Sequence, residues 1–557
     1  MPGMIKGETS NSIPHSPSLS VSTTSFSSLS RVSAHQSSPS TASTAAQLTW
    51  LQELRSEERG LYLIHLLLAC ANAVANNNME HTNVYLEQLS VLASLTGDPM
   101  QRVATYFMEG LAARITKSWP GLYKALHSTH LPSMIDMLSA RQVFFSVCPY
   151  IKFSFLMANQ AILDAMEGEK VVHIVDLEAS DPVQWLALLQ ELSFRQGGPP
   201  HLRITGVGTR DVLEQTGQRL SEEAEKLDIP FQFHPLVASL ENVDIDSLKV
   251  KSGEAVAISS VMRLHPLLAK ESTTTHVVPP TDVHDHPNRP IIRHSRSSSG
   301  GYERITCVGR ESSPINTSSA GEEMQVDQRR LKRSRDSYEP TDLAENLKSV
   351  DSELAGPHQR SSRSVQESDG GLHGSSNVER GVSRDQLDSS SCHNSEHTSG
   401  PGSVVVQRVL QKLQGLAPKV MVVVEQDSNH NSGVMPERFV EALHYYSAMF
   451  DSLDLTLPQH CAERVTLEKY LLGHEIKNIV ACEGVERFVR HEKVDRWRMR
   501  MRSAGFVARP LSSLATLQAK RLLHGFPTDG YRLKEDQGCL TLCWQDTPLY
   551  TASAWTV

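Results

Sequence analysis

The sequence predicts an α/β protein with a mostly parallel sheet and a helical segment ahead of that sheet. Apolar runs of strand length alternate with amphipathic stretches of helix length over residues 171–265, and again from residue 404. Such alternation is typical of βαβ units, whose parallel strands are covered by helices on both faces. Residues 50–167 show helical periodicity alone, so we expect an N-terminal helical cap.

Two segments are too polar to build a core. Residues 1–45 are mostly Ser, Thr, Ala and Pro, and residues 271–402 are rich in Ser, His, Arg, Asp and Gly. Their apolar surface is too small to offset the entropy lost on ordering, so we expect both to be disordered. The expected organisation is a tail over 1–45, one folded domain over 50–270 and 403–557, and an insertion over 271–402 that interrupts it.

Composition narrows the class of protein. The 557 residues carry a net charge of −9, which differs from the basic face of proteins that grip DNA phosphates, so DNA contact is expected to be indirect or weak. The eight cysteines form no Cys-x-x-Cys pair, which fits a reducing compartment better than a zinc site. No apolar run is long enough for a membrane span, so no membrane partner is expected.

The helical segment shows four helices. They are expected over residues 61–75, 84–95, 98–115 and 151–167, and Asp98-Pro99 supplies the start signal of the third. Residues 63–67 match the L-x-x-L-L pattern of docking helices, although such pentads occur more often in buried helices. We therefore expect these leucines to pack in the core.

The α/β unit begins with a buried strand at residues 171–177. Asp181 then caps a helix with Pro182 at its first position, and the inner face of that helix includes Trp185. A β/α series closed by a C-terminal hairpin is the layout of a methyltransferase-like, Rossmann-type core. Further strands are expected at 201–207 and 231–236, within 254–265 and at 419–425, helices at 212–227, 404–416, 436–453, 486–502 and 512–523, and the hairpin at 531–535 and 539–544.

The turn after the first strand is unsuited to an adenosyl cofactor. Such a cofactor needs a glycine-rich turn that lets the backbone approach closely. The turn from Asp176 to Pro182 contains no glycine, adds the carboxylates Glu178 and Asp181, and places the Ala179 and Ser180 side chains where the cofactor would lie. We predict no cofactor, no metal and no catalytic residue. The alternative is a methyltransferase-like enzyme with an atypical pocket.

Several long motifs resemble one plant family. Residues 172–176 with Gln184-Trp185 resemble the VHIID block of GRAS proteins, residues around Pro418 and Tyr445-Tyr446 resemble the PFYRE block, and residues 553–555 resemble the SAW block. Residues 118–126 look most like the scarecrow-like 3 branch. The family-motif or interaction candidates are Val172, His173, Ile174, Val175, Asp176, Gln184, Trp185, Pro418, Tyr445, Tyr446, Arg487, Trp497, Ser553, Ala554 and Trp555.

The resemblance implies a nuclear transcriptional regulator. GRAS proteins pair with one another through the helical cap. They also dock DNA-binding transcription factors such as zinc-finger proteins, often without reading DNA themselves. The resemblance further implies a role in plant development or in gibberellin-type hormone signalling.

A basic cluster in the insertion is a nuclear import candidate. Short exposed basic runs are bound by import receptors, although they are also common as solvated charge. The Ser-rich tail, with Glu8 as its only acidic residue, instead resembles a plastid transit peptide. The import candidates are Arg329, Arg330, Lys332, Arg333 and Arg335.

Four features have a structural and a functional interpretation. Asp176 fits a capping carboxylate better than a catalytic one, and His173 fits a core histidine better than a ligand. Arginines alternate over residues 496–502, which favours a solvated helix over a partner-binding or phosphate-contacting face. Helices between residues 60 and 130 contain more leucine than a short cap can bury, so we expect their apolar faces to contact a second chain.

Overall fold

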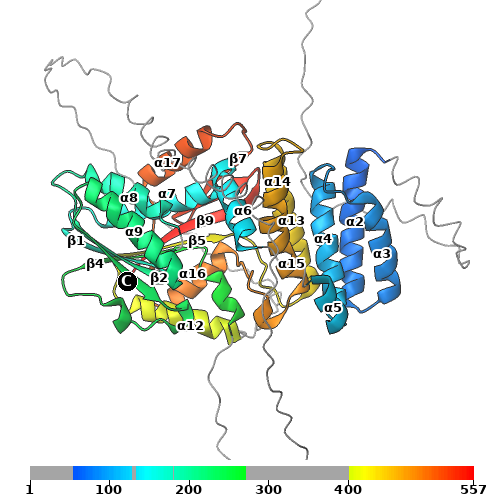
Figure 1. Ribbon diagram of the computed structural model, residues 1–557, viewed down its shortest axis with the longest axis horizontal. Helices are drawn as coiled ribbons and strands as arrows, with labels where there is room; N and C mark the ends of the chain where they lie inside the picture. The colour runs from blue at the N-terminus through cyan, green and yellow to red at the C-terminus, as the bar shows by residue number, and fades with distance from the viewer. Residues whose placement is uncertain (1–53, 128–132, 180, 271–400) are drawn as a thin grey trace, which may run out of the picture. The chain divides into compact units, whose positions relative to one another are not determined.

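A computed structural model describes residues 54–127, 133–179, 181–270 and 401–557. The predicted tail over 1–45, nearly all of the predicted insertion and Ser180 lie outside these residues. Within them the predicted α/β class is confirmed, with a helical cap preceding a mostly parallel sheet (Figure 1).

The sheet runs in the order β3-β2-β1-β4-β5-β9-β8-β7, and β6 pairs with β9. Strands β1 to β5 are parallel, and β9, β8 and β7 continue the sheet in antiparallel pairs. The step from β1 to β4 reverses the direction of winding, and ligands of such sheets bind beside this point at the carboxyl ends of the strands. The strands are β1 (Val171–Asp176), β2 (His201–Gly208), β3 (Phe231–Val237), β4 (Ala255–Val261), β5 (Val420–Gln426), β6 (Val507–Arg509), β7 (Tyr531–Asp536), β8 (Cys539–Trp544) and β9 (Thr547–Thr556).

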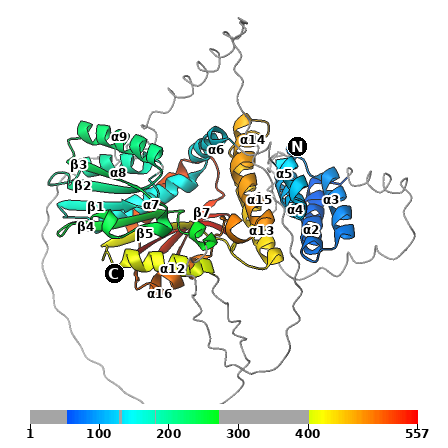
Figure 2. The ribbon, with the colours of Figure 1, turned by 60° about the horizontal axis from the view of Figure 1, so that its bottom comes forward.

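Helices cover both faces of the sheet. Figures 1 and 2 show α7, α8 and α9 on one side and α12 and α16 on the other, and α17 packs against α7. Val175, Ile258 and Val423 from the central strands share one hydrophobic cluster with α12 and α16. These helices are α7 (Pro149–Ala165), α8 (Val183–Ser193), α9 (Arg210–Lys226), α12 (Pro401–Gln414), α16 (Val494–Ser503) and α17 (Ser513–His524).

The cap packs against helices from the second half of the chain. Helix α4 begins at a capping box in which the Asp98 side chain accepts from the Gln101 backbone N–H, with Pro99 at the first turn, as the sequence predicts. Gly110 lets α4 approach α15 closely, because a β-carbon there would lie 3.1 Å from Val480. The cap comprises α2 (Ser56–Ala75), α3 (Met79–Leu92), α4 (Pro99–Thr116) and α5 (Pro120–His127); α4 contacts α13 (Met435–Asp454) and α15 (Gly473–Ala481).

Several predicted boundaries are wrong. The predicted helix 486–502 begins only at Val494, because residues 487–493 bond to other segments: Asn478 Oδ1 accepts from the Val489 N–H, and His491 O accepts from the His430 N–H. Leu95, predicted on the second helix, lies beyond the end of α3, whereas β4 lies within residues 254–265 as predicted. Elements missed in the sequence are α5, α6 (Met134–Val147), α14 (Ala462–Leu467), the π-helix η4 (Glu468–Leu472), α15, β6 and β9; 3-10 turns lie at η1 (Leu240–Asn242), η2 (Asp246–Leu248), η3 (His265–Ala269) and η5 (Gly484–Glu486).

Candidate functional site

Asp176 closes the turn that follows β1. Its Oδ2 accepts from Trp185 Nε1 at 2.7 Å, and its Oδ1 accepts from the Glu178 N–H at 3.1 Å. Burial raises the pKa of the Asp176 carboxyl to about 6, although both hydrogen bonds act in the opposite direction. These contacts match the predicted capping role, in which the carboxylate orients the turn and the first residues of α8.

The turn itself lies on the carboxyl ends of the strands. Its backbone N–H groups donate to the sheet, from Leu177 to Ser259 O at 3.0 Å and from Ala179 to Val207 O at 3.1 Å. Ala179 is fully buried, and its methyl group packs so closely on Gly206 that a β-carbon at residue 206 would lie 2.5 Å from it. The chain's own turn therefore occupies the place beside β1 and β2 where this fold class binds its ligand.

The two acidic side chains of the turn are also engaged. Glu178 pairs with Arg263 at 3.4 Å, and Asp181 Oδ1 accepts from the Val183 N–H at 3.0 Å. Helix α8 begins at Val183, one residue later than predicted, so Pro182 precedes its first residue. The predicted contribution of Ser180 lies outside the described residues.

The remaining residues of the first motif pack the centre of the sheet. Val172, Ile174 and Val175 are buried. His173 lies 2.8 Å from Thr205 Oγ1 through Nε2 and 3.3 Å from Glu254 Oε2 through Nδ1. Burial, and then the nearby Arg203 guanidinium, lower the pKa of His173. His173 is therefore a buried and hydrogen-bonded core residue, as the sequence predicts.

Gln184 links α8 to α7. Its Nε2 donates to Asn159 Oδ1 at 3.2 Å, while Asn159 Nδ2 donates to the Gln184 carbonyl at 2.8 Å. Trp185 is fully buried beside it. Both residues thus position α8 over the strand ends.

A second group of buried polar residues follows β5. His430 Nδ1 lies 2.9 Å from His491 Nδ1, and the His265 ring meets the His491 ring edge-on at 4.3 Å. Glu425 holds this group to the sheet, since its Oε2 lies 2.8 Å from His265 Nδ1. Burial lowers the pKa of His430 to about 3 and also lowers the pKa of His491, so these two rings are neutral at neutral pH.

The aromatic pair Tyr445 and Tyr446 packs on this histidine cluster. The His430 ring stacks on Tyr446 at 5.8 Å and meets Tyr445 edge-on at 5.3 Å. Tyr446 donates its hydroxyl proton to Glu475 Oε2 at 2.8 Å, and Arg487 donates to the His430 carbonyl at 2.7 Å. The sequence analysis named Tyr445, Tyr446 and Arg487 only as separate motif candidates, and the structure brings them together at this cluster. His265, Glu425, His430 and His491 were not among the site candidates, although the last three lie within motif segments of the sequence.

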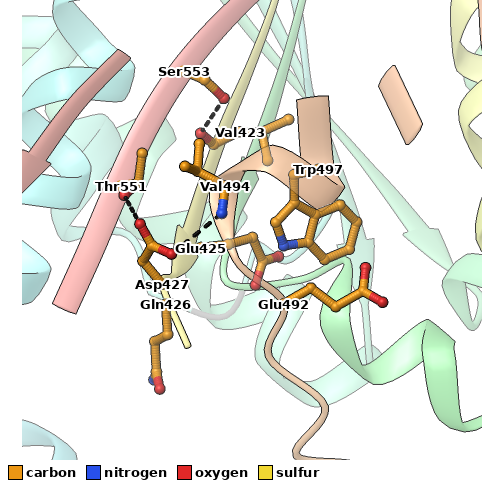
Figure 3. Close-up of a pocket in the computed structure, with 9 residues that line it drawn as sticks. All are labelled: Val423, Glu425, Gln426, Asp427, Glu492, Val494, Trp497, Thr551 and Ser553. Carbon is orange, nitrogen blue, oxygen red and sulfur yellow. Dashed lines mark hydrogen bonds between the residues drawn. The ribbon is translucent and has the colours of Figure 1, made fainter. Parts of the chain in front are cut away.

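A small hollow of about 10 Å³ lies at the end of β5 (Figure 3). Its acidic side chains already have partners: Asp427 accepts from Thr551 Oγ1 at 3.0 Å, and Glu492 pairs with Arg500 at 2.6 Å. The hollow is smaller than a typical small-molecule pocket, and its carboxylates are engaged within the chain. It is lined by Val423, Glu425, Gln426, Asp427, Glu492, Val494, Trp497, Thr551 and Ser553.

The other motif residues are structural in their contacts. Pro418 is buried just before β5, and Trp497 is buried in the cluster beneath α16. Ser553, Ala554 and Trp555 lie on β9, where Trp555 Nε1 donates to Ser553 Oγ at 2.9 Å. The strand that carries this last motif pairs with β5 and so joins the C-terminus to the parallel part of the sheet.

The arginine-rich helix α16 is not fully solvated. Arg498 is buried and pairs with Asp495 at 2.7 Å and with Asp536 at 3.0 Å. Arg500 makes a two-point contact with Glu492. The solvated interpretation is therefore wrong for these two side chains.

The cap exposes apolar side chains while burying the L-x-x-L-L leucines. Leu63, Leu66 and Leu67 are buried, as expected from the sequence. Leu61 is 64% exposed and Trp119 is 51% exposed. The other half-exposed apolar residues of the cap are Met79, Val84, Leu95, Leu122 and Leu126.

The import candidates and the insertion histidines lie outside the described residues. Among the residues described, no helix is long and apolar enough to cross a membrane. The same residues contain no group of three or more His, Cys, Asp or Glu side chains placed to hold a metal ion.

Comparison with known proteins places these features in a family context. The sequence profile described as the GRAS domain family matches residues 63–556. The chain is 43% identical over 522 residues to scarecrow-like protein 3 of Arabidopsis thaliana, covering 93% of each chain, and 31% identical to chitin-inducible gibberellin-responsive protein 2 of Oryza sativa subsp. japonica, covering 88% of this chain and 68% of the relative. The crystal structure of SCL7 in Oryza sativa aligns over 88% of this chain and 99% of that chain with a TM-score of 0.57 at 24% identity, a likeness that concerns the fold alone.

Proposed function

The chain belongs to the GRAS domain family, and from this premise we propose that it is a nuclear coregulator of transcription that acts through contacts with other proteins. The name of the gibberellin-responsive rice relative favours a role in hormone signalling of that type. The partners that we propose are other GRAS chains and DNA-binding factors such as zinc-finger proteins, with DNA contacted indirectly or weakly.

This proposal rests on one observation: the turn after β1 fills the space at the carboxyl ends of β1 and β2. In an enzyme of this fold class, the carboxyl ends of β1 and β2 would leave room for a cofactor. Here Ala179 packs on Gly206, and the turn backbone bonds to the sheet. A sheet whose ligand crevice is occupied by its own chain favours a binding role over catalysis.

The cap offers the surface for a second GRAS chain. Leu61 and Trp119 expose apolar area that water solvates poorly, and each buried square ångström is worth about 25 cal/mol. Association through such a surface depends little on salt, because screening acts on charges. The complex should therefore persist at moderate ionic strength.

Sedimentation equilibrium of the full chain, alone and with a GRAS relative, tests this association. We expect a dimer that Leu61→Glu or Trp119→Glu weakens. A matched control is Phe194→Glu, since Phe194 is 75% exposed but follows α8, away from the cap. A strictly monomeric chain that recovers no GRAS partner from plant extract would refute the proposed mode of action.

A fluorescent fusion in plant cells tests the proposed compartment. We expect nuclear fluorescence that decreases when Arg329, Arg330, Lys332, Arg333 and Arg335 are replaced by Gln. Accumulation in plastids, with loss of the first residues of the chain, would contradict nuclear action.

A further inference from the structure

Four arginines converge on one carboxylate where the cap meets the second half of the chain. Arg114 comes from α4, Arg438 from α13, and Arg487 and Arg490 from the segment between α15 and α16. Helices α4, α13 and α15 lie side by side in Figure 2, and α4 contacts both α13 and α15. The shared carboxylate is Glu483.

Glu483 cannot neutralise all four guanidinium groups. Its Oε1 lies 2.8 Å from Arg114 Nη1 and also contacts Arg438 Nη2, and its Oε2 lies 3.6 Å from Arg487 Nε. Arg490 has no carboxylate within ion-pair distance among the described residues, and its N–H groups donate to the Arg487 carbonyl at 2.7 Å, the Gly484 carbonyl at 2.7 Å and Asn431 Oδ1 at 2.9 Å.

The neighbouring carboxylates form ion pairs with other basic side chains. Glu486 pairs with Lys117 at 2.7 Å, and Glu492 makes a two-point contact with Arg500. Arg487 Nε is buried without a hydrogen-bond partner in the described part of the chain. Burial, and then Arg438 and Arg490, lower the pKa of Arg487 to about 9, as expected where positive charges face one another without sufficient counter-charge.

The cluster opens to solvent on one side. The Glu483 side chain is 46% exposed and that of Arg114 is 25% exposed, whereas Arg438 is fully buried. The buried arginines therefore supply a fixed positive field, and Arg114 and Arg490 offer N–H groups at its rim. Guanidinium groups arranged in this way match the oxygens of a phosphoryl group in charge and in geometry.

We propose that Arg114, Arg438, Arg487 and Arg490 form a binding site for a phosphoryl oxyanion, which shares or displaces the contacts of Glu483. The oxyanion is either free inorganic phosphate or the phosphate of a phosphorylated serine or threonine. A bound phosphate would add counter-charge between α4, α13 and the 483–490 segment, and so would tighten the attachment of the cap. The site does not depend on the proposed transcriptional role.

Isothermal titration of the full chain with inorganic phosphate, at constant ionic strength set with chloride, tests the site. We expect saturable binding that Arg490→Gln weakens about tenfold or more, because a charge-assisted contact is lost. Arg532→Gln is the matched control, since Arg532 is an exposed arginine paired with Asp546 on a distant strand. Circular dichroism confirms that each variant is folded.

Glu483→Gln should change the affinity for phosphate in the opposite direction. It removes the competing carboxylate, so we expect tighter phosphate binding than in the wild type, a gain that a merely structural role for the arginines does not produce. If Arg490→Gln fails to fold, the comparison of Glu483→Gln with the wild type decides the question on its own.

A short phosphoserine peptide and its unphosphorylated form distinguish the source of the oxyanion. Tighter binding of the phosphopeptide than of phosphate supports the site with a phosphoprotein ligand, and the reverse order supports it with free phosphate. Absence of saturable heat with both probes at about 10 mM, or equal weakening by Arg490→Gln and Arg532→Gln, would overturn the proposal.

Discussion

At the scale of single residues, the Ala179 methyl group fills the space beside β2 at the carboxyl ends of the strands. Ala179 lies where the turn crosses the end of β2, and Gly206 beneath it lacks the β-carbon that would collide with that methyl group. Because the Ala179 side chain of the turn packs directly on residue 206 of β2, glycine is needed at residue 206 and not in the turn. The sequence indicated that the turn lacks glycine, but which strand residue receives Ala179 depends on register that single-sequence patterns do not specify.

Gly206→Ala tests this packing. Its new β-carbon would lie 2.5 Å from the Ala179 β-carbon and 3.0 Å from Phe233, so we expect the free energy of unfolding to fall by about 1–3 kcal/mol. Gly208→Ala is the control, because its closest neighbour is Leu213 at 3.3 Å. In urea denaturation, Ala179→Gly combined with Gly206→Ala should recover part of the loss. Strict additivity of the two changes would count against direct contact.

Asp176 makes stability depend on pH. Its pKa of about 6 in the folded chain lies above the ordinary value of 3.8, so its contribution is fully present below that ordinary value and is lost as the pH rises through 6. Asp176→Asn removes this pH dependence. Its single amide oxygen can accept from only one of the two donors, the Trp185 indole N–H and the Glu178 backbone N–H. We expect the variant to be less stable at pH 4.5, with the difference from wild type narrowing by on the order of 2 kcal/mol by pH 7. Denaturant titrations at both pH values measure this, and a widening difference would contradict the raised pKa.

At the scale of elements, buried charge fixes the cap to the rest of the domain. Arg102 on α4 donates to Glu468 in the π-helix η4 at 3.0 Å and to Asp454 at the end of α13 at 3.0 Å. Gly473 faces Tyr106 so closely that a β-carbon would lie 2.5 Å from its ring, which holds η4 and α15 against α4. These contacts, with the packing of α4 on α13 and α15, position the cap on the rest of the domain.

Arg102→Met should leave Glu468 buried without its main partner. We expect a loss of about 3–5 kcal/mol in the free energy of unfolding, measured by chemical denaturation. Arg55→Met removes an exposed ion pair with Glu58 and should change stability little. If both substitutions had equal small effects, the buried ion pair would not be what anchors α4.

Elements with strong local signals were predictable, and those defined by tertiary contacts were not. The Asp98-Pro99 start of α4 and the buried strand β1 carry their signals in adjacent residues. Residues 487–493 have helix-like composition, yet they form no helix, because they bond to Asn478 and His430 instead. The π-helix η4 also depends on distant residues, because Arg102 reaches its Glu468 from α4.

At the scale of the whole molecule, the folded domain closes without the predicted insertion. Turn η3 and helix α12, which flank residues 271–400, pack against each other. The segments on either side of residues 271–400 are therefore held together by contacts within the domain. The extra chain length between them is not needed to bring them together.

Replacing residues 273–399 by about twelve Gly and Ser residues, which span roughly 20 Å, should leave the melting temperature within a few degrees of the full chain. The same deletion removes Arg329 to Arg335 and should reduce nuclear accumulation. Differential scanning calorimetry and imaging of fluorescent fusions measure the two effects. Loss of cooperative unfolding would show that the segment contributes to the fold, and undiminished nuclear accumulation would exclude the cluster as the import signal.

We infer that this sheet is a scaffold for protein contacts whose strand ends bind no adenosyl cofactor. Calorimetric titration of the full chain with S-adenosylmethionine at millimolar concentration tests it most directly, because Ala179 and the turn backbone occupy the strand ends where that cofactor would lie. We expect only the heat of dilution. A saturable isotherm that is abolished by Ala179→Val, in a variant with an unchanged circular dichroism spectrum, would contradict it.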